Sequence, residues 1–392
     1  MTPTPQLTDQ PWDETYSDII DVRSQAEFAQ DHIPGSINLP VLNNEQRAQV
    51  GTVYKQESPF KARKLGAALV SENIAIHLQQ HFADKPKDYQ PLIYCWRGGQ
   101  RSGSMALVLT QIGWRVTLLK GGYKTYRAWV RSQLETLPNQ FEYRILAGLT
   151  GSAKTQILQN LSVQALDLEG LANHRGSLLG VLFDSPQPTQ KGFESRLLVA
   201  FQKLDPGQPV WLEAESNKIG QVYLPQALWK KMQTSTGVEL KVGICDRVNY
   251  LLAEYPQWIE NPAQLKQKLE RLTSRYGKVQ IQHWTDLIDA KQWSAFVQSM
   301  LEEHYDPAYS RSFQQQYPQV TQTYQLSDLS SVSLERLQTH LSSQEFLRRL
   351  PAPRRTQTCL GPAGINVTGC NKDDGMRFIV FVEWERVRIC SA

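Results

Sequence analysis

Cysteine is scarce in this chain of 392 residues: there are five, an odd number, widely scattered and never at C-x-x-C spacing. This pattern argues against a disulfide framework and against a structural zinc site. Long apolar runs are missing too, since none approaches the roughly 20 residues that a membrane span needs. The polar first ten residues lack the basic stretch and apolar core of a secretory signal. We therefore expect no membrane anchor and a cytoplasmic location.

A strong charge of either sign is also absent. The formal net charge is +4, with 20% charged and 41% hydrophobic residues, which is ordinary for a globular protein. A mildly basic chain permits an anionic partner such as RNA but does not require one. The length is sufficient for two domains and a small third one.

Short apolar segments alternate with helical patterns along the chain. Strands are expected at residues 18–22, 37–39, 91–94 and 116–119, and again at 144–147, 209–213 and 240–244. Helices are expected at 102–112, 123–134 and 154–161, with a helical region from 262 to 304. This alternation predicts an α/β fold with parallel sheets. We expect a domain at 15–137, a linker at 137–140, a second domain at 141–350 with a helical C-terminal part, and an unassigned tail at 351–392.

Cys95 is the strongest candidate for a catalytic residue. It follows an apolar strand and precedes two glycines and a helix, so backbone N–H groups and a helix N-terminus would face its sulfur. Arg97 and Arg101 add positive charge, and together these effects would lower the thiol pKa and stabilise a persulfide or selenopersulfide. The alternative is a buried structural cysteine. The predicted active-site loop comprises Trp96, Arg97, Gly98, Gly99, Gln100, Arg101 and Ser102.

Residues 148–155 follow a predicted strand and open a predicted helix, which is the context of a Walker A phosphate loop. Backbone N–H groups would cradle phosphates, Lys154 would neutralise them and Thr155 would reach Mg²⁺. Ala153 replaces the usual glycine before the lysine, so we expect weakened or altered phosphate binding. A chance glycine-rich turn is the alternative. The predicted phosphate-binding residues are Gly148, Gly151, Ser152, Lys154, Thr155 and Arg175.

Two acidic residues are rival ligands for a Mg²⁺ ion or its water: Glu213 at the end of an apolar strand, and Asp167. Either could instead be a solvated carboxylate. Farther along, five basic residues punctuate the helical region, and they form either a solvated face or a contact with an RNA backbone. They are Lys266, Lys268, Arg271, Arg275 and Lys278.

Residues 21–28 and 32–38 resemble the front of a rhodanese domain, a family in which the residues corresponding to Asp21 and Arg23 help hold the active-site loop. The run C-W-R-G-G-x-R-S at residues 95–102 is similar to that of the tRNA 2-selenouridine synthases, in which a P-loop domain follows the rhodanese domain. Further segments resemble that family over residues 15–350: 54–55, 60–66, 121–127, 167–177, 187–194, 211–220 and 304–309.

The resemblance implies an enzyme that replaces the sulfur of wobble 2-thiouridine in tRNA with selenium from selenophosphate, through an intermediate geranylated by geranyl diphosphate. Cys95 would carry the selenium or assist its delivery, and the P-loop would hold a phosphate-bearing substrate. No tightly bound cofactor is implied. One alternative is a rhodanese-type sulfurtransferase fused to a P-loop NTPase without a role in tRNA modification; another is a regulatory phosphate-binding module. The tail has no assigned function, although residues 378–384 read as a strand.

Overall fold

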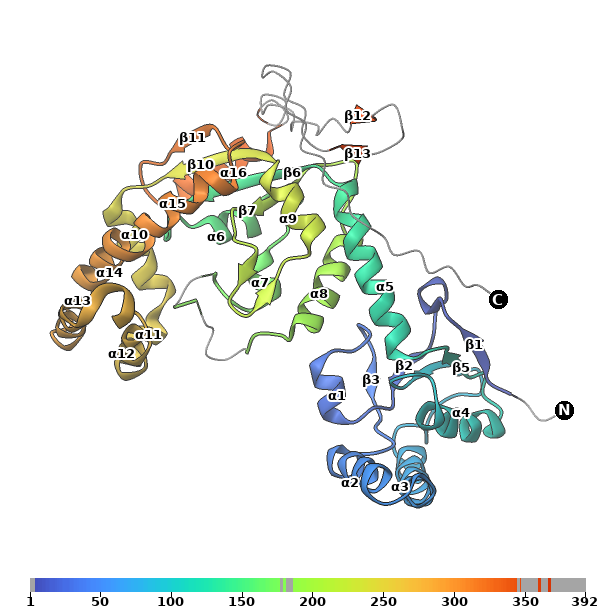
Figure 1. Cartoon of the computed structure of the whole chain (residues 1–392). Helices are drawn as coiled ribbons and strands as arrows, with labels where there is room; N and C mark the ends of the chain where they lie inside the picture. Colours follow the sequence, from blue (N-terminus) through green and yellow to red (C-terminus); the bar gives the residue numbers. More distant parts are fainter. Residues whose placement is uncertain are drawn as a thin grey trace, which may run out of the picture. The chain divides into compact units, whose positions relative to one another are not determined.

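The computed structural model describes residues 4–176, 179–180, 186–343 and 346, and two short antiparallel strands, β12 (Cys359–Leu360) and β13 (Asn366–Val367) (Figure 1). The chain divides into a large unit, residues 1–352, and a small one, residues 353–392. The strand expected at 378–384 lies outside the described residues. Within the described part, no helix is both long enough and apolar enough to cross a bilayer.

A five-stranded parallel sheet forms the N-terminal part of the large unit, with the order β1-β5-β4-β2-β3. Its strands are β1 (Gln6–Thr8), β2 (Asp18–Asp21), β3 (Ile37–Asn38), β4 (Pro91–Tyr94) and β5 (Thr117–Leu119). All four residues of β4 are buried, as expected for a strand covered on both faces. The parallel α/β prediction is confirmed here.

The helices of this part include a pair that the sequence analysis did not predict, α2 (Asn44–Gln56) and α3 (Pro59–Gln79), which pack against each other. Ser58 caps α3 by accepting a hydrogen bond from the Phe60 N–H, and Pro59 occupies the first turn, where no N–H is needed. The remaining helices are η1 (Pro11–Asp13), α1 (Gln25–Gln30), α4 (Gln100–Ile112) and α5 (Tyr123–Thr136).

Residues 137–140 are not an open linker. They form a 3₁₀ turn, η2 (Leu137–Gln140), directly after α5. Pro138 is buried, and its carbonyl oxygen accepts a hydrogen bond of 2.9 Å from the Tyr143 hydroxyl. The turn is therefore fixed to the first strand of the next sheet.

The second sheet has four parallel strands in the order β11-β10-β6-β7. They are β6 (Tyr143–Gly148), β7 (Val210–Glu213), β10 (Thr236–Lys241) and β11 (Gln322–Gln325). All six residues of β6 are buried. The strand expected at 240–244 is β10, which begins and ends earlier. It cannot reach residue 244, because Gly243 is the N-cap of the helix α10 (Ile244–Glu254).

Helices surround this sheet and continue into the predicted helical region (Figure 1). Around the sheet lie α6 (Lys154–Gln159), α7 (Leu168–Ala172), α8 (Gln190–Gln202), α9 (Gln226–Gln233) and α16 (Ser331–Ser342), with a hairpin of β8 (Lys218–Ile219) and β9 (Val222–Tyr223). The helical region extends beyond the predicted 262–304 at both ends. It contains α10, α11 (Pro256–Glu260), α12 (Pro262–Glu270), α13 (Thr273–Asp289), α14 (Trp293–Met300), the π-helical turn η3 (Leu301–Tyr305) and α15 (Asp306–Gln316). Its own core contains Leu265, Leu269 and Trp284.

Candidate functional site

Cys95 lies at the end of β4 and is only 3% exposed. Its Sγ accepts hydrogen bonds from the Gly99 N–H, at 3.3 Å, and from the Ser102 hydroxyl, at 3.2 Å. Gly98 has φ +63°, which turns the chain so that α4 can begin at Gln100, close to the sulfur. The predicted geometry, a thiol facing backbone N–H groups at a helix start, is present.

The pKa of the Cys95 thiol is lowered. Burial is the largest single influence and raises it, but hydrogen bonds from Ser102 and from the backbone N–H groups of Arg97 and Gly99 outweigh that effect. No arginine side chain is among the main influences on this pKa. Arg101 is held by Glu27 through contacts of 2.6 and 3.2 Å, which neutralise its charge.

The loop is held by a close backbone contact with the turn after β5. The Tyr123 N–H donates to the Cys95 carbonyl oxygen at 2.8 Å. Gly122 has φ +61°, and a Cβ there would lie 2.2 Å from the Cys95 carbonyl oxygen and 2.5 Å from the Gly98 nitrogen. Only glycine can therefore occupy this position without displacing the cysteine loop.

Asp21 and Arg23 form a buried ion pair beside the loop, at the position where the resemblance implied a supporting role. Arg23 is 1% exposed, and its guanidinium donates to Asp21 at 2.6 to 3.0 Å and to the Asp31 carbonyl oxygen at 2.7 Å. It also lies 4.0 Å from the ring centroid of Tyr123 and 5.7 Å from that of Tyr94. It thus packs against aromatic residues from both segments that hold Cys95.

Helix α8 from the second sheet domain contacts the same region. Arg127 of α5 pairs with Glu194, and the Lys191 ammonium lies 5.6 Å from the ring centroid of Trp96. Trp96 in turn stacks on Tyr123. The loop that begins with Cys95 is therefore contacted from both sheet domains.

The phosphate loop connects β6 to α6, and three of its residues have positive φ: Gly148, Gly151 and Ala153. Ala153 has φ +56°, a left-handed conformation that costs a residue with a Cβ about 1–2 kcal/mol. Its methyl group is buried against Leu146 and Ile157. The backbone conformation that glycine would favour is kept, so the expected weakening of phosphate binding depends on the methyl group alone and stays a prediction.

Two of the predicted phosphate-binding residues, Lys154 and Arg175, are cations. The Lys154 ammonium donates to the Gly148 and Leu149 carbonyl oxygens at 2.8 and 3.4 Å, so it lies over its own loop. Arg175 pairs with Glu254 at 2.8 Å and lies 4.8 Å from the ring centroid of Tyr255. Both side chains face one cleft.

This cleft has a volume of about 730 Å³, within the usual range for ligand sites. Every residue that the sequence analysis assigned to phosphate or cation binding lines this cleft. Its lining includes Gly148, Gly151, Ser152, Lys154, Thr155, Asp167, Arg175 and Glu213. The predicted residues therefore meet in space although they come from four separate segments.

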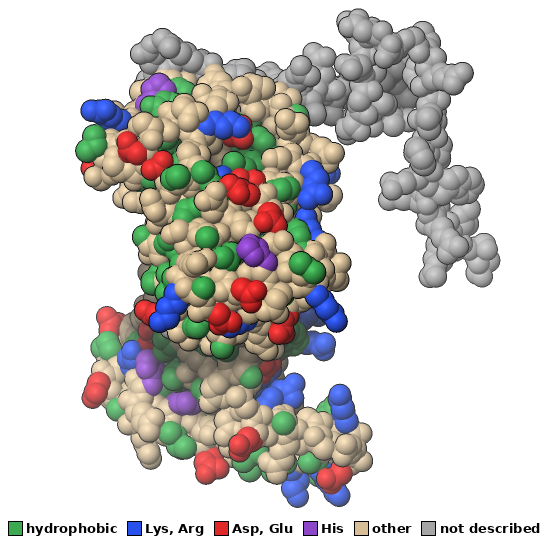
Figure 2. All heavy atoms as spheres, turned by 90° about the vertical axis from the view of Figure 1, so that its left-hand side faces the viewer, with side chains coloured by type: hydrophobic (Ala, Val, Ile, Leu, Met, Phe, Trp, Pro, Cys, Tyr) green, Lys and Arg blue, Asp and Glu red, His purple; other side chains and the backbone are tan. Residues whose placement is uncertain are grey.

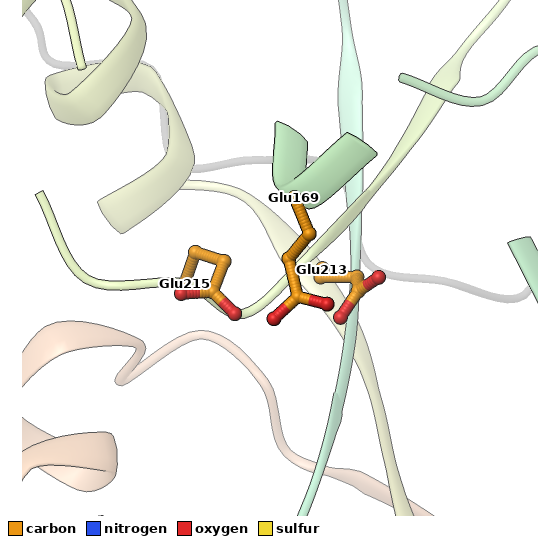
Figure 3. Close-up of side chains that lie close together, drawn as sticks. All are labelled: Glu169, Glu213 and Glu215. Atoms are coloured by element: carbon orange, nitrogen blue, oxygen red, sulfur yellow. The ribbon is translucent and has the colours of Figure 1, made fainter. Parts of the chain in front are cut away.

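Three glutamates gather at the base of the loop, and sequence reasoning identified only one of them (Figure 3). Glu169, Glu213 and Glu215 each place one carboxylate oxygen within 4.8 Å of the others. Burial and mutual repulsion raise the pKa of Glu213 to about 8 and of Glu215 to about 7, and raise that of Glu169 well above its usual value. Asp167 instead caps α7, accepting from the Gly170 N–H at 2.7 Å; its role as a cation ligand stays a prediction.

An apolar pocket adjoins the cleft. Its wall is almost entirely hydrophobic and comes mainly from the helical region: Leu252, Trp258, Ile259, Leu265, Trp293, Val297, Met300 and Leu301. Leu179, from the segment between α7 and α8, completes it. Thr150 of the phosphate loop, together with Leu251, Tyr255 and Tyr305, lines both the pocket and the cleft. A ligand with a polar head and an apolar tail could therefore occupy both.

The basic residues of the helical region are not a single free stripe. Lys266 pairs with Asp289, while Arg275 lines the cleft. Figure 2 shows basic and acidic side chains interspersed on the face that it displays. RNA contact by this run stays a prediction.

Comparison with known proteins agrees with this architecture. Residues 4–128 match the family model of the rhodanese-like domain, and residues 141–340 match that of the tRNA 2-selenouridine synthase AAA domain. A tRNA 2-selenouridine synthase from Sulfurovum sp. is 34% identical over 319 residues, covering 74% of this chain and 87% of that one. Another, from Marinobacter nauticus, is 33% identical over 334 residues, covering 77% and 90%. A third, from Shewanella oneidensis, is 34% identical over 325 residues, covering 74% and 85%.

Proposed function

Because this chain belongs to the tRNA 2-selenouridine synthase family, we propose that it is an enzyme that modifies tRNA, replacing the sulfur of wobble 2-thiouridine with selenium. Selenophosphate would supply the selenium, and geranyl diphosphate would first alkylate the sulfur. In the alkylation a C–S bond forms to the prenyl C1, the C–O bond to diphosphate breaks, and the base loses a proton. In the second step the selenium of selenophosphate bonds to C2 of the base and the geranyl thiolate leaves. Water then cleaves the Se–P bond, which releases phosphate and the selenouridine.

One observation supports geranyl diphosphate as the substrate of the first step: the phosphate cleft and the apolar pocket share lining residues. Lys154 and the loop N–H groups suit a diphosphate, and the aromatic and aliphatic pocket suits a hydrocarbon chain. The pocket has a volume of about 70 Å³, so its side chains would have to move to admit a ten-carbon tail. Burial is worth about 0.8 kcal/mol per CH₂, so complete burial of that tail would contribute up to about 8 kcal/mol. A nucleotide would place a polar base or ribose there, which favours a prenyl diphosphate over the NTPase alternative.

Cys95 supports the selenium step. Its lowered pKa favours the thiolate, and the Gly99 N–H and the Ser102 hydroxyl would stabilise an anion, such as the selenium of a bound selenophosphate, at this position. The two activities would thus use separate sites, Cys95 for selenium and Lys154 for the prenyl donor.

Nucleoside analysis by mass spectrometry tests the proposal. Thiolated tRNA incubated with the protein, selenophosphate and geranyl diphosphate should yield geranylthiouridine and selenouridine. Cys95→Ser should accumulate geranylthiouridine. Lys154→Ala should fail on thiolated tRNA but still convert tRNA that is already geranylated. If wild-type protein forms neither nucleoside, the proposal is wrong.

Ligand affinity tests the role of the pocket. Calorimetry should show that geranyl diphosphate binds at least a hundredfold more tightly than inorganic diphosphate, because only the former has a tail to bury. Equal affinities would mean that the apolar pocket is unused. Robust ATP or GTP hydrolysis without RNA, together with no tRNA product, would favour the sulfurtransferase–NTPase alternative.

A further inference from the structure

The glutamate cluster is assembled from two parts of the fold. Glu169 lies on α7, Glu213 ends β7, and Glu215 follows in the next loop (Figure 3). One oxygen from each lies within 4.8 Å of the other two. Oxygens bound to one cation at about 2.0–2.6 Å stand up to roughly 5 Å apart, so this spacing fits a single coordination shell.

The hydrogen bonds of the cluster leave one strong acceptor unused. The Thr155 hydroxyl donates to Glu169 at 3.1 Å. Glu213 is 2% exposed, yet its Oε1 has no hydrogen-bond partner among the residues that the structure describes. A buried carboxylate oxygen without a donor indicates a ligand at that point, because buried polar atoms are nearly always satisfied.

The local charge leads to the same conclusion. Lys154 is the ammonium group that acts on all three carboxylates, but its donated hydrogen bonds go to Gly148 and Leu149. Three carboxyl groups share this point with one ammonium group, and a divalent cation would stabilise all three as carboxylates. Gly176 closes the cluster on another side, since a Cβ there would lie 2.9 Å from Glu215 and 3.0 Å from Glu169.

We infer that Glu169, Glu213 and Glu215 bind one divalent cation, Mg²⁺ or Mn²⁺, and that they do so without any phosphate ligand. Carboxylate oxygens are the ligands that these hard cations prefer. A phosphate loop that offers a cation only one hydroxyl and one carboxylate needs phosphate oxygens of the substrate as further ligands. Three carboxylates can hold the cation with protein ligands and water. The contact between Thr155 and Glu169 places this ion next to the phosphate loop. The inference does not depend on the proposed tRNA activity.

Mn²⁺ is a suitable probe, because electron paramagnetic resonance distinguishes bound from free ion. Full-length protein freed of metal with a chelator should bind one Mn²⁺ per chain without phosphate, nucleotide or tRNA, and Mg²⁺ should compete. Glu215→Gln should weaken Mn²⁺ binding at least tenfold. Glu254→Gln is the matched control, because Glu254 lines the same cleft but pairs with Arg175. Its Mn²⁺ affinity should equal that of the wild type.

Thermal melting shows whether Glu215→Gln loses Mn²⁺ binding because the variant is unfolded. Without metal, Glu215→Gln should melt no lower than the wild type, since it removes one of three mutually repelling carboxylates. Mn²⁺ should raise the melting temperature of the wild type and of Glu254→Gln, but not of Glu215→Gln. The inference fails if the wild type binds no Mn²⁺, if it binds Mn²⁺ only together with a diphosphate, or if Glu215→Gln binds as tightly as the wild type. Phosphate-independent Mn²⁺ binding in a protein that forms no modified nucleoside would sustain this inference and refute the proposed function.

Discussion

Replacing Ser102 with alanine should raise the pKa of Cys95. Ser102 is fully buried, and its hydroxyl lies 3.2 Å from the Cys95 sulfur. The variant removes that one donor. It leaves the Gly99 N–H at 3.3 Å and the start of α4 in place. The change therefore isolates one contribution to thiolate stability.

The size of the effect follows from the charge of the acceptor. A hydrogen bond to an ionised group is worth about 1.5–3 kcal/mol, and one pKa unit corresponds to about 1.4 kcal/mol. The hydroxyl donates to the thiolate, so its loss disfavours the charged form and the pKa rises, by about 1–2 units. At a pH below both pKa values, the thiolate fraction of Cys95 should fall by about tenfold to a hundredfold.

Rates of alkylation by iodoacetamide across a pH series measure this pKa. Mass spectrometry of the Cys95 peptide is needed because Cys245 is exposed and reacts as well. Ser104→Ala is the control, since Ser104 lies on the same helix but donates to the Gln100 carbonyl oxygen at 2.8 Å. An unchanged midpoint in Ser102→Ala, or an equal shift in Ser104→Ala, would refute the assignment.

Three further substitutions test the framework of the two loops. Arg23→Ala leaves the buried Asp21 carboxylate unpaired, so the free energy of unfolding in urea should fall by about 3–5 kcal/mol; a loss below about 1 kcal/mol would contradict this. Gly122→Ala forces a Cβ to within 2.2 Å of the Cys95 carbonyl oxygen, so alkylation of Cys95 should lose its low-pH reactivity; wild-type kinetics would show that the loop tolerates the contact. Ala153→Gly relieves left-handed strain, but it removes a buried methyl group and adds entropy to the unfolded chain. The free energy of unfolding should therefore change by less than about 1 kcal/mol, and a larger decrease would mean that the contacts of the methyl group dominate.

The fold was predictable where strands are buried on both faces. The segments of β4 and β6 contain the apolar runs PLIY and ILAG, β2 has two isoleucines at its centre, and the structure places strands there. The strands β1 and β11 were missed because they are short edge strands rich in polar residues, QLT and QTYQ. Both are recognisable only from their pairing with a neighbouring strand.

The error at Arg101 has a simple cause. Arg101 is close to Cys95 in the sequence, but its guanidinium donates to the carboxylate of Glu27 on α1, 74 residues earlier in the chain. Neighbouring charges in sequence say little about where a long side chain points. The backbone donors were predictable because they belong to the same few consecutive residues as the sulfur.

The glutamate cluster shows how topology makes one part of a site predictable and hides another. Because β6 and β7 are adjacent and parallel, Leu146 pairs with Glu213, and the phosphate loop begins just beyond Leu146. A carboxylate ending the neighbouring strand must therefore lie beside that loop, which is why Glu213 could be inferred from its strand alone. Glu169 reaches the same point from α7, a helix of five residues whose direction depends on its cap at Asp167. Only the folded chain determines where such a short helix points.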